Sequence, residues 1–182
     1  MRAALRLAAI IDAASRQLGG VVRWCALGVV LVQFVVVLLR YAYGSSYVWM
    51  QESVIYLHAM LFMLAIGYTF LVDGHVRVDV LYANWSARRR AFVDLLGILI
   101  GVLPFCALLL WASWSFAWTS WSLGEGPMQY GGLPFTPFFK SLIPAMAILL
   151  ALQSVAIGIR CAAVLAGAAE THFPTREGSA HG

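Results

Sequence analysis

Four long apolar stretches dominate this sequence and restrict what it can fold into. They run over about residues 21–40, 48–72, 91–113 and 141–163, and the pattern of the third continues to residue 122. Each is close to the ~20 residues with which a helix crosses the ~30 Å hydrocarbon core of a bilayer. Backbone groups in lipid must satisfy one another, and a β-barrel would show alternating segments of ~10 residues instead. The sequence therefore predicts an all-α integral membrane protein with four transmembrane helices.

The few charged residues indicate how the chain is oriented. They make up 11% of the sequence, against about 25% in soluble domains. Ten of the 12 basic residues lie before the first span, in the middle loop or towards the C-terminal end, namely Arg2, Arg6, Arg16, Arg23, Arg77, Arg88, Arg89, Arg90, Arg160 and Arg176. The positive-inside rule therefore predicts that both termini and the middle loop are cytoplasmic. The thin spread of this charge favours membrane lipids as partners and argues against nucleic acid.

The chain begins with an amphipathic segment. On a helix, apolar side chains such as Leu7 and Ile10 lie opposite an arc that holds the arginines and Asp12. This pattern predicts a helix in the cytoplasmic interface, with a helical extension of the first span as the alternative. We expect residues 1–166 to form a single membrane domain and residues 167–182 to form a polar, disordered tail.

Ionisable residues within predicted spans are the first candidates for a functional role. Glu52 lies near the periplasmic start of the second span, as a capped or solvated helix end or in contact with a partner helix. His58 lies deeper and is more typical of a packing residue than of a ligand. The cysteines, Cys25, Cys106 and Cys161, are far apart in sequence. We therefore expect no disulfide framework, metal site, cofactor or catalytic centre.

A series of tryptophans extends the third span. They stand at spacings of 3, 4 and 3 and share one helical face: Trp111, Trp114, Trp118 and Trp121. Tryptophan is frequent at membrane interfaces, so simple anchoring is one interpretation. The series climbs about 15 Å along a helix, which is more than one interfacial level. We therefore favour packing on a partner protein or on another helix.

Prolines and a serine suggest local features of the last two helices. Pro104 lies within the third span, where it is expected to kink the helix. Ser141 could cap the fourth helix, with Pro144 in its first turn.

The loop at residues 73–82 alternates polar and apolar side chains. A lone strand is implausible there, which leaves an ordered turn at the interface or an ordinary loop whose arginines enforce topology. Its Gly74-His75-Val76-Arg77-Val78-Asp79 segment resembles the small membrane subunit of tripartite ATP-independent periplasmic (TRAP) transporters, the DctQ-like family. The similarity covers about residues 20–160 and extends to Arg40-Tyr41, Trp49, Gln51-Glu52, Gly124-Glu125, Gly132-Leu133-Pro134, Lys140, Pro144 and Leu152-Gln153.

The resemblance implies a role in uptake across the bacterial inner membrane. A periplasmic binding protein would capture an organic acid, and a large membrane subunit would move it inward by an elevator-type motion driven by sodium. The small subunit would be a fixed scaffold that binds neither substrate nor sodium. Residues expected at the interface with the large subunit are Trp111, Trp114, Trp118 and Glu52. Arg40 and Trp49 would lie at the periplasmic edge, and Gly74, His75, Arg77 and Asp79 would form the cytoplasmic motif.

Two other functions stay open at this point. One is a four-helix membrane oxidoreductase of the disulfide or quinone type, which matches in size but for which paired cysteines and paired membrane histidines are missing. The other is an accessory subunit of a different membrane complex, which only the family motifs argue against. We expect a transport protein and not an enzyme.

Overall fold

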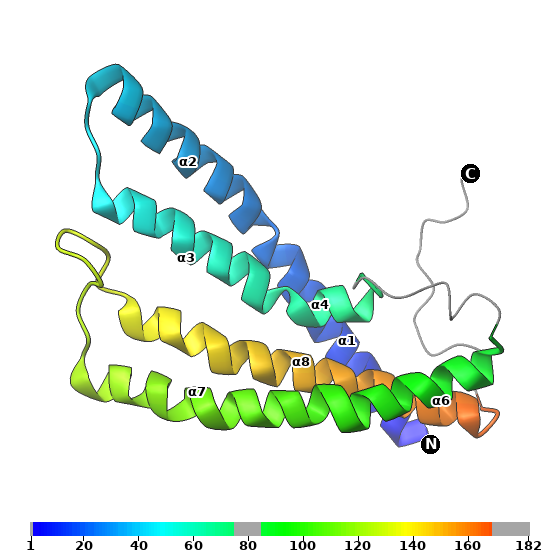
Figure 1. The fold of residues 1–182 in the computed structure, drawn as a ribbon. Helices are drawn as coiled ribbons and strands as arrows, with labels where there is room; N and C mark the ends of the chain where they lie inside the picture. The colour runs from blue at the N-terminus through cyan, green and yellow to red at the C-terminus, as the bar shows by residue number, and fades with distance from the viewer. Residues whose placement is uncertain (1, 75–84, 169–182) are drawn as a thin grey trace, which may run out of the picture.

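The computed structural model describes residues 2–74 and 85–168, and every element in these ranges is helical (Figure 1). The elements are α1 (Arg2–Val22), α2 (Trp24–Tyr43), α3 (Val48–Leu64), α4 (Ile66–Leu71), α6 (Ala87–Gly97), the π-helical turn η1 (Ile98–Val102), α7 (Leu103–Leu123) and α8 (Thr136–Leu165). Four continuous helical runs are long and apolar enough to cross a membrane. The predicted class, an all-helical protein with four membrane-spanning helices, is confirmed.

Short irregularities divide three of these runs. A turn at Arg23 separates α1 from α2, and Ala65 separates α3 from α4. In the third run, η1 lies directly before Pro104. A proline ring clashes with the carbonyl of the fourth residue before it, here Ile100, so a wider π turn accommodates it. The distortion expected around Pro104 is thus a π turn on its N-terminal side.

The start of the fourth helix differs from the expectation. The α8 helix begins at Thr136, and Pro137 lies in its first turn, where a missing N–H is tolerated. Ser141 is therefore not an N-cap, because its hydroxyl donates to the carbonyl of Pro137 at 2.8 Å, one turn earlier. Pro144 lies inside the helix instead of in its first turn. The apolar pattern indicated the membrane-embedded part of α8 and not its first turn.

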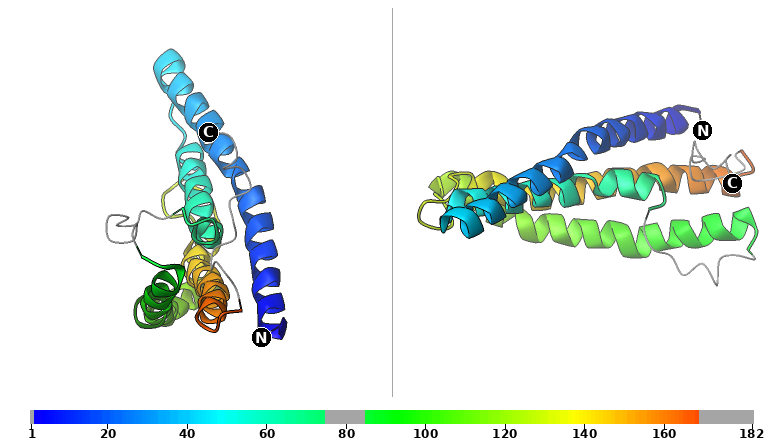
Figure 2. Two further views of the ribbon diagram at one scale, coloured as in Figure 1. Left: turned by 90° about the vertical axis from the view of Figure 1, so that its right-hand side faces the viewer. Right: turned by 90° about the horizontal axis from the view of Figure 1, so that it is seen from above.

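The α8 helix is the centre of the packing. It contacts α1, α3, α4, α6 and α7, and it is the most buried of the four membrane-spanning runs. Many of its buried positions are small, such as Ala147, Ala156 and Ala163, which lets neighbouring backbones approach closely. In Figures 1 and 2, α7 lies alongside α8, whereas α2 lies at the outside of the molecule against α3.

Candidate functional site

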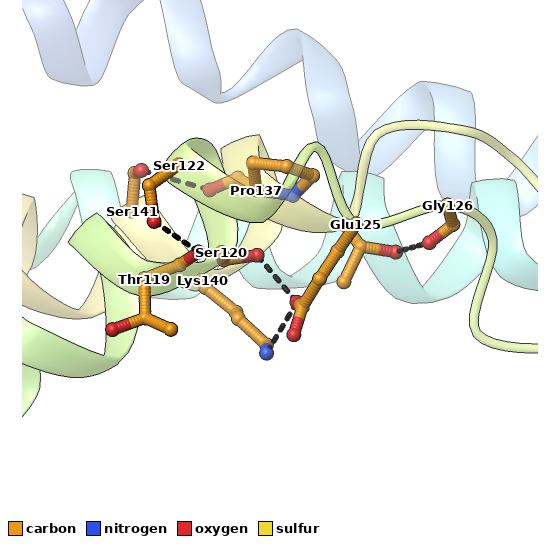
Figure 3. A network of polar contacts seen from close by, with 9 residues as sticks. Thr119, Ser120, Ser122, Glu125, Gly126, Pro137, Lys140 and Ser141 are labelled. Atoms are coloured by element: carbon orange, nitrogen blue, oxygen red, sulfur yellow. Dashed lines mark hydrogen bonds and ion pairs between the residues drawn. The ribbon is translucent and has the colours of Figure 1, made fainter.

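The connection between α7 and α8 is tied together by the carboxylate of Glu125 (Figure 3). The α7 helix ends at Gly124, which has a left-handed backbone with φ of 59°. Glu125 then accepts a hydrogen bond from the Ser120 hydroxyl and pairs with Lys140 Nζ, each at 2.5 Å. The hydrogen bond from Lys140, followed by that from Ser120, lowers the pKa of this carboxyl below its ordinary value. The charge of Glu125 thus joins the end of α7 to the start of α8.

A second carboxylate holds the same connection from the other side. Glu52 in α3 is only 6% exposed, and its Oε2 accepts a hydrogen bond from the backbone N–H of Leu133 at 2.6 Å. Gly132 lies directly against this carboxylate, so that a Cβ at position 132 would overlap both oxygens. Glu52 is therefore not a solvated helix end, because its carboxylate is buried against this connection. Its expected contact with the large subunit stays a prediction.

The residue one turn after Glu52 completes the packing at this end of the molecule. Tyr56 is buried, and its ring lies 4.7 Å from that of Phe139 at the start of α8, measured between centroids. Glu52 and Tyr56 are four residues apart on α3 and therefore share one face of that helix. Within the described part of the chain, Glu52 Oε1 and the Tyr56 hydroxyl are buried without a hydrogen-bond partner. The ends of α3, α7 and α8 beside the α7–α8 connection form one packed unit.

The tryptophan series lies on the outer face of α7. Trp111, Trp114 and Trp118 are 79%, 58% and 67% exposed, so most of each indole lies outside the contacts within the chain. Trp121 differs, because its Nε1 donates to the Ser141 hydroxyl on α8 at 2.8 Å. Trp121 is also 58% exposed, so it is set apart by this hydrogen bond to α8 and not by burial.

A groove runs beside these indoles. It encloses about 480 Å³ between α7 and α8 and is lined mainly by Trp114, Trp118 and Trp121 on one side and by Pro144 and Ile148 on the other. Trp121 fixes one wall through its hydrogen bond to α8. The result is an apolar surface with a depression between α7 and α8.

Arg40 and Trp49 lie on either side of the link between α2 and α3. Arg40 is exposed in the last turn of α2, where its charge complements the helix dipole. The helix ends at Gly44, with φ of 64°. Trp49 is 48% exposed and contacts the ring of Tyr47. Both residues are accessible at the end of the molecule that also carries the α7–α8 connection (Figure 1).

At the opposite end, a buried polar network attaches α1 to α8. Asp12 pairs with Arg160 and accepts a hydrogen bond from the Gln153 amide at 2.9 Å. The oxygen of Gln153 in turn accepts a hydrogen bond from Ser15 at 2.7 Å. Asp12, Ser15 and Gln153 are all buried. Asp12 therefore does not belong to a solvated polar face of α1, and its partner Arg160 lies within α8.

The sequence carried a signal for this network. Gln153 and Arg160 are seven residues apart, which places both on one face of α8 within an otherwise apolar stretch. Two such groups on a membrane helix require partners. The partner residues on α1 could not be chosen from the pattern, because Asp12 also fitted the polar arc of that helix.

A comparison with protein families identifies the kind of protein. The model described as "Tripartite ATP-independent periplasmic transporters, DctQ component" matches residues 29–163. The chain belongs to this family. No curated protein and no solved structure matches it at a significant level. The chain is thus the small permease component of a TRAP transporter and a multi-pass membrane protein.

The DctQ match covers most of α2 and the helices that follow, and it leaves out α1. Gln153 and Arg160 lie within the matched range, whereas their partners Asp12 and Ser15 lie outside it. Of the motif that was expected on the cytoplasmic side, Gly74 is described and lies against Thr69 of α4. His75, Arg77 and Asp79 lie outside the described residues, as does most of the expected tail at 167–182.

Proposed function

We propose that this DctQ component is the fixed scaffold for the large membrane subunit of its transporter. In this proposal both termini are cytoplasmic, the α7–α8 connection is periplasmic, and the chain resides in the bacterial inner membrane. The transporter takes up an organic acid that a periplasmic binding protein delivers, and a sodium gradient drives the uptake. The scaffold itself binds neither the acid nor sodium.

The observation that carries the proposal is the outward tryptophan face of α7. Trp111 lies 12 residues before the end of α7 at Leu123, which at 1.5 Å per residue is about 18 Å along the helix and near the middle of a bilayer. An indole N–H at that depth has no acceptor among lipid tails, whereas a neighbouring protein can supply one. Simple interfacial anchoring accounts for tryptophans near the helix end but not for Trp111.

The internal contacts support a rigid role. The chain is held at one end by Glu52 and Glu125, which bind the α7–α8 connection, and at the other by Asp12, which joins α1 to α8. A mobile transport domain needs a stationary surface to move against. Connections at both ends of the spans would keep the groove of α7 and α8 in one shape.

The accessible periplasmic edge fits a transient partner. Arg40 and Trp49 are exposed beside the α2–α3 link, where a charged group and an indole can meet a soluble protein. We propose that the binding protein approaches this edge while the large subunit occupies the α7 face. The two partners then use different surfaces of the same scaffold.

Co-purification tests the proposal. Isolation of the tagged chain from native membranes in mild detergent is expected to bring along a stoichiometric membrane protein with many more spans. Trp114→Ala with Trp118→Ala should weaken that association by about 1–2 kcal/mol per residue, the range of a well-packed interface side chain. The matched control is Leu31→Ala with Phe34→Ala, which removes exposed apolar side chains from α2 instead.

Each outcome has a clear meaning. Loss of the partner with the α7 variant but not with the α2 variant supports the assigned face, and the reverse assigns the interface to α2. Sodium-dependent uptake by the reconstituted transporter, with binding protein added, then tests the coupling. Isolation of the chain alone, or with bound haem or quinone, would contradict the scaffold role and revive the membrane oxidoreductase hypothesis.

A further inference from the structure

An open cavity at the start of α6 has no part in the scaffold contacts described above. It encloses about 740 Å³, and its walls include Trp85, Arg88, Arg89, Phe92, Val93 and Leu165. Leu165 is the last residue of α8, so the cavity spans the ends of two helices that pack on each other. It lies at the opposite end of the molecule from the α7–α8 connection (Figure 1).

The rim of the cavity carries two arginines, which have no acidic partner in the described part of the chain. Arg88 and Arg89 are exposed, and neither pairs with an acidic group among residues 2–74 and 85–168. Asp94 is the acidic residue of α6, but it does not line the cavity and already has a partner. The first turn of α6 adds the positive end of a helix dipole, and Ser86 does not cap it through its side chain.

The cavity also has apolar lining, and apolar side chains continue beyond it along α6. Phe92 lies four residues after Arg88, about 6 Å deeper along the helix, and it is 56% exposed. Leu96 and Leu99 follow at helical spacing and are also exposed, at 45% and 54%. A strip of apolar surface therefore leads away from the two guanidinium groups towards the membrane interior.

We propose that this cavity binds an anionic phospholipid, with its phosphate between Arg88 and Arg89 and an acyl chain along Phe92 and Leu96. Guanidinium groups match phosphate oxygens in charge and geometry. A soluble phosphate would use the rim alone, whereas a lipid satisfies both the charged rim and the apolar wall. The orientation proposed above places this end at the cytoplasmic leaflet, but binding in detergent does not depend on it.

Native mass spectrometry of the full-length, delipidated chain in detergent tests this site. The probes are dioleoyl phosphatidylglycerol, which is anionic, and dioleoyl phosphatidylcholine, which is zwitterionic. The chain is expected to prefer phosphatidylglycerol by about 30-fold, because each of the two arginines near a membrane surface adds roughly 1 kcal/mol for anionic lipid. Arg88→Gln with Arg89→Gln should abolish most of that preference, and Arg88→Lys with Arg89→Lys should keep most of it.

The matched control removes two exposed arginines elsewhere, with Arg2→Gln and Arg6→Gln in α1. An equal loss of preference in this control would reduce the effect to overall charge and overturn the site. An unchanged preference in the Arg88 and Arg89 double glutamine variant would also overturn it. Glycerol 3-phosphate should compete poorly, and full competition would instead assign a soluble phosphate to the rim. Should the glutamine variant unfold, Phe92→Ala is expected to weaken phosphatidylglycerol retention by itself, and an unchanged retention would refute the acyl-chain contact.

Discussion

Removal of the Asp12 carboxylate is expected to destabilise the protein strongly. In Asp12→Ala, Arg160 stays in a site where its side chain is 16% exposed, and it loses its counter-ion. The side-chain amide of Gln153 loses its hydrogen-bond acceptor in the same variant. Breaking a buried ion pair from one side costs about 3–5 kcal/mol, because an uncompensated charge remains. The partial exposure of Arg160 favours the lower end, about 3 kcal/mol. For a chain of this size that corresponds to a fall in Tm of about 6–12 °C.

The natural cysteines provide the assay. Cys106 and Cys161 are buried, so a thiol-reactive fluorescent dye reports their exposure as the protein unfolds in detergent. A double-mutant cycle with Asp12→Ala, Arg160→Ala and the double variant should show a coupling of at least about 1 kcal/mol, since the double variant leaves no unpaired charge. Arg16→Ala, at an exposed position of the same helix, is the control. Additive effects, or an Asp12 variant as stable as the Arg16 variant, would refute the network.

Three further predictions rest on close contacts and on charge. Gly19→Ala should lower the Tm by overpacking, because its Cβ would lie 2.6 Å from a ring carbon of Tyr68 in α4. At Gly20 a Cβ would meet nothing within 4 Å, so Gly20→Ala should raise the Tm slightly. Gly132→Ala should release the α7–α8 connection, seen as faster proteolysis there, while Gly126→Ala, which is unobstructed, should not. Glu125 has a lowered pKa in the folded protein, so its stabilising contribution is complete above the ordinary value of 4.5 and is lost as the pH falls through the lowered value. The Tm difference between the protein and Glu125→Gln should therefore shrink in acid, and a constant difference would contradict this.

The apolar stretches predicted the helices well because membrane burial imposes one simple requirement on composition. The turns that divide the first two helical runs were harder to predict, because Arg23 and Ala65 are not helix-breaking residues. The positions of these turns depend on how α1 and α4 pack on α8. The true start of α8 did have a local signal. Thr136 followed by Pro137 is typical of a helix start, but these residues precede the apolar pattern and Ser141 fitted the same role.

The candidate site was predicted in part. The helical spacing of the tryptophans fixed their common face, but the pattern could not decide which side of α7 meets α8. Only the packed structure separates Trp121, which bonds to Ser141, from the three outward indoles. The sequence left Glu52 open between a capped or solvated helix end and a contact with a partner helix. Its partner is the backbone of Leu133, which is 81 residues away in sequence.

The sequence by itself determined that the protein lies in a membrane, how many spans it has and to which family it belongs. These properties follow from local composition, from charge distribution and from short motifs. The tertiary structure decided which polar groups meet and which apolar faces stay open. Asp12 and Arg160 come together only because α1 crosses α8, a contact between residues 148 positions apart. Such pairings depend on how helices pack, and in a bilayer many apolar faces are interchangeable until small residues and buried polar groups select one arrangement.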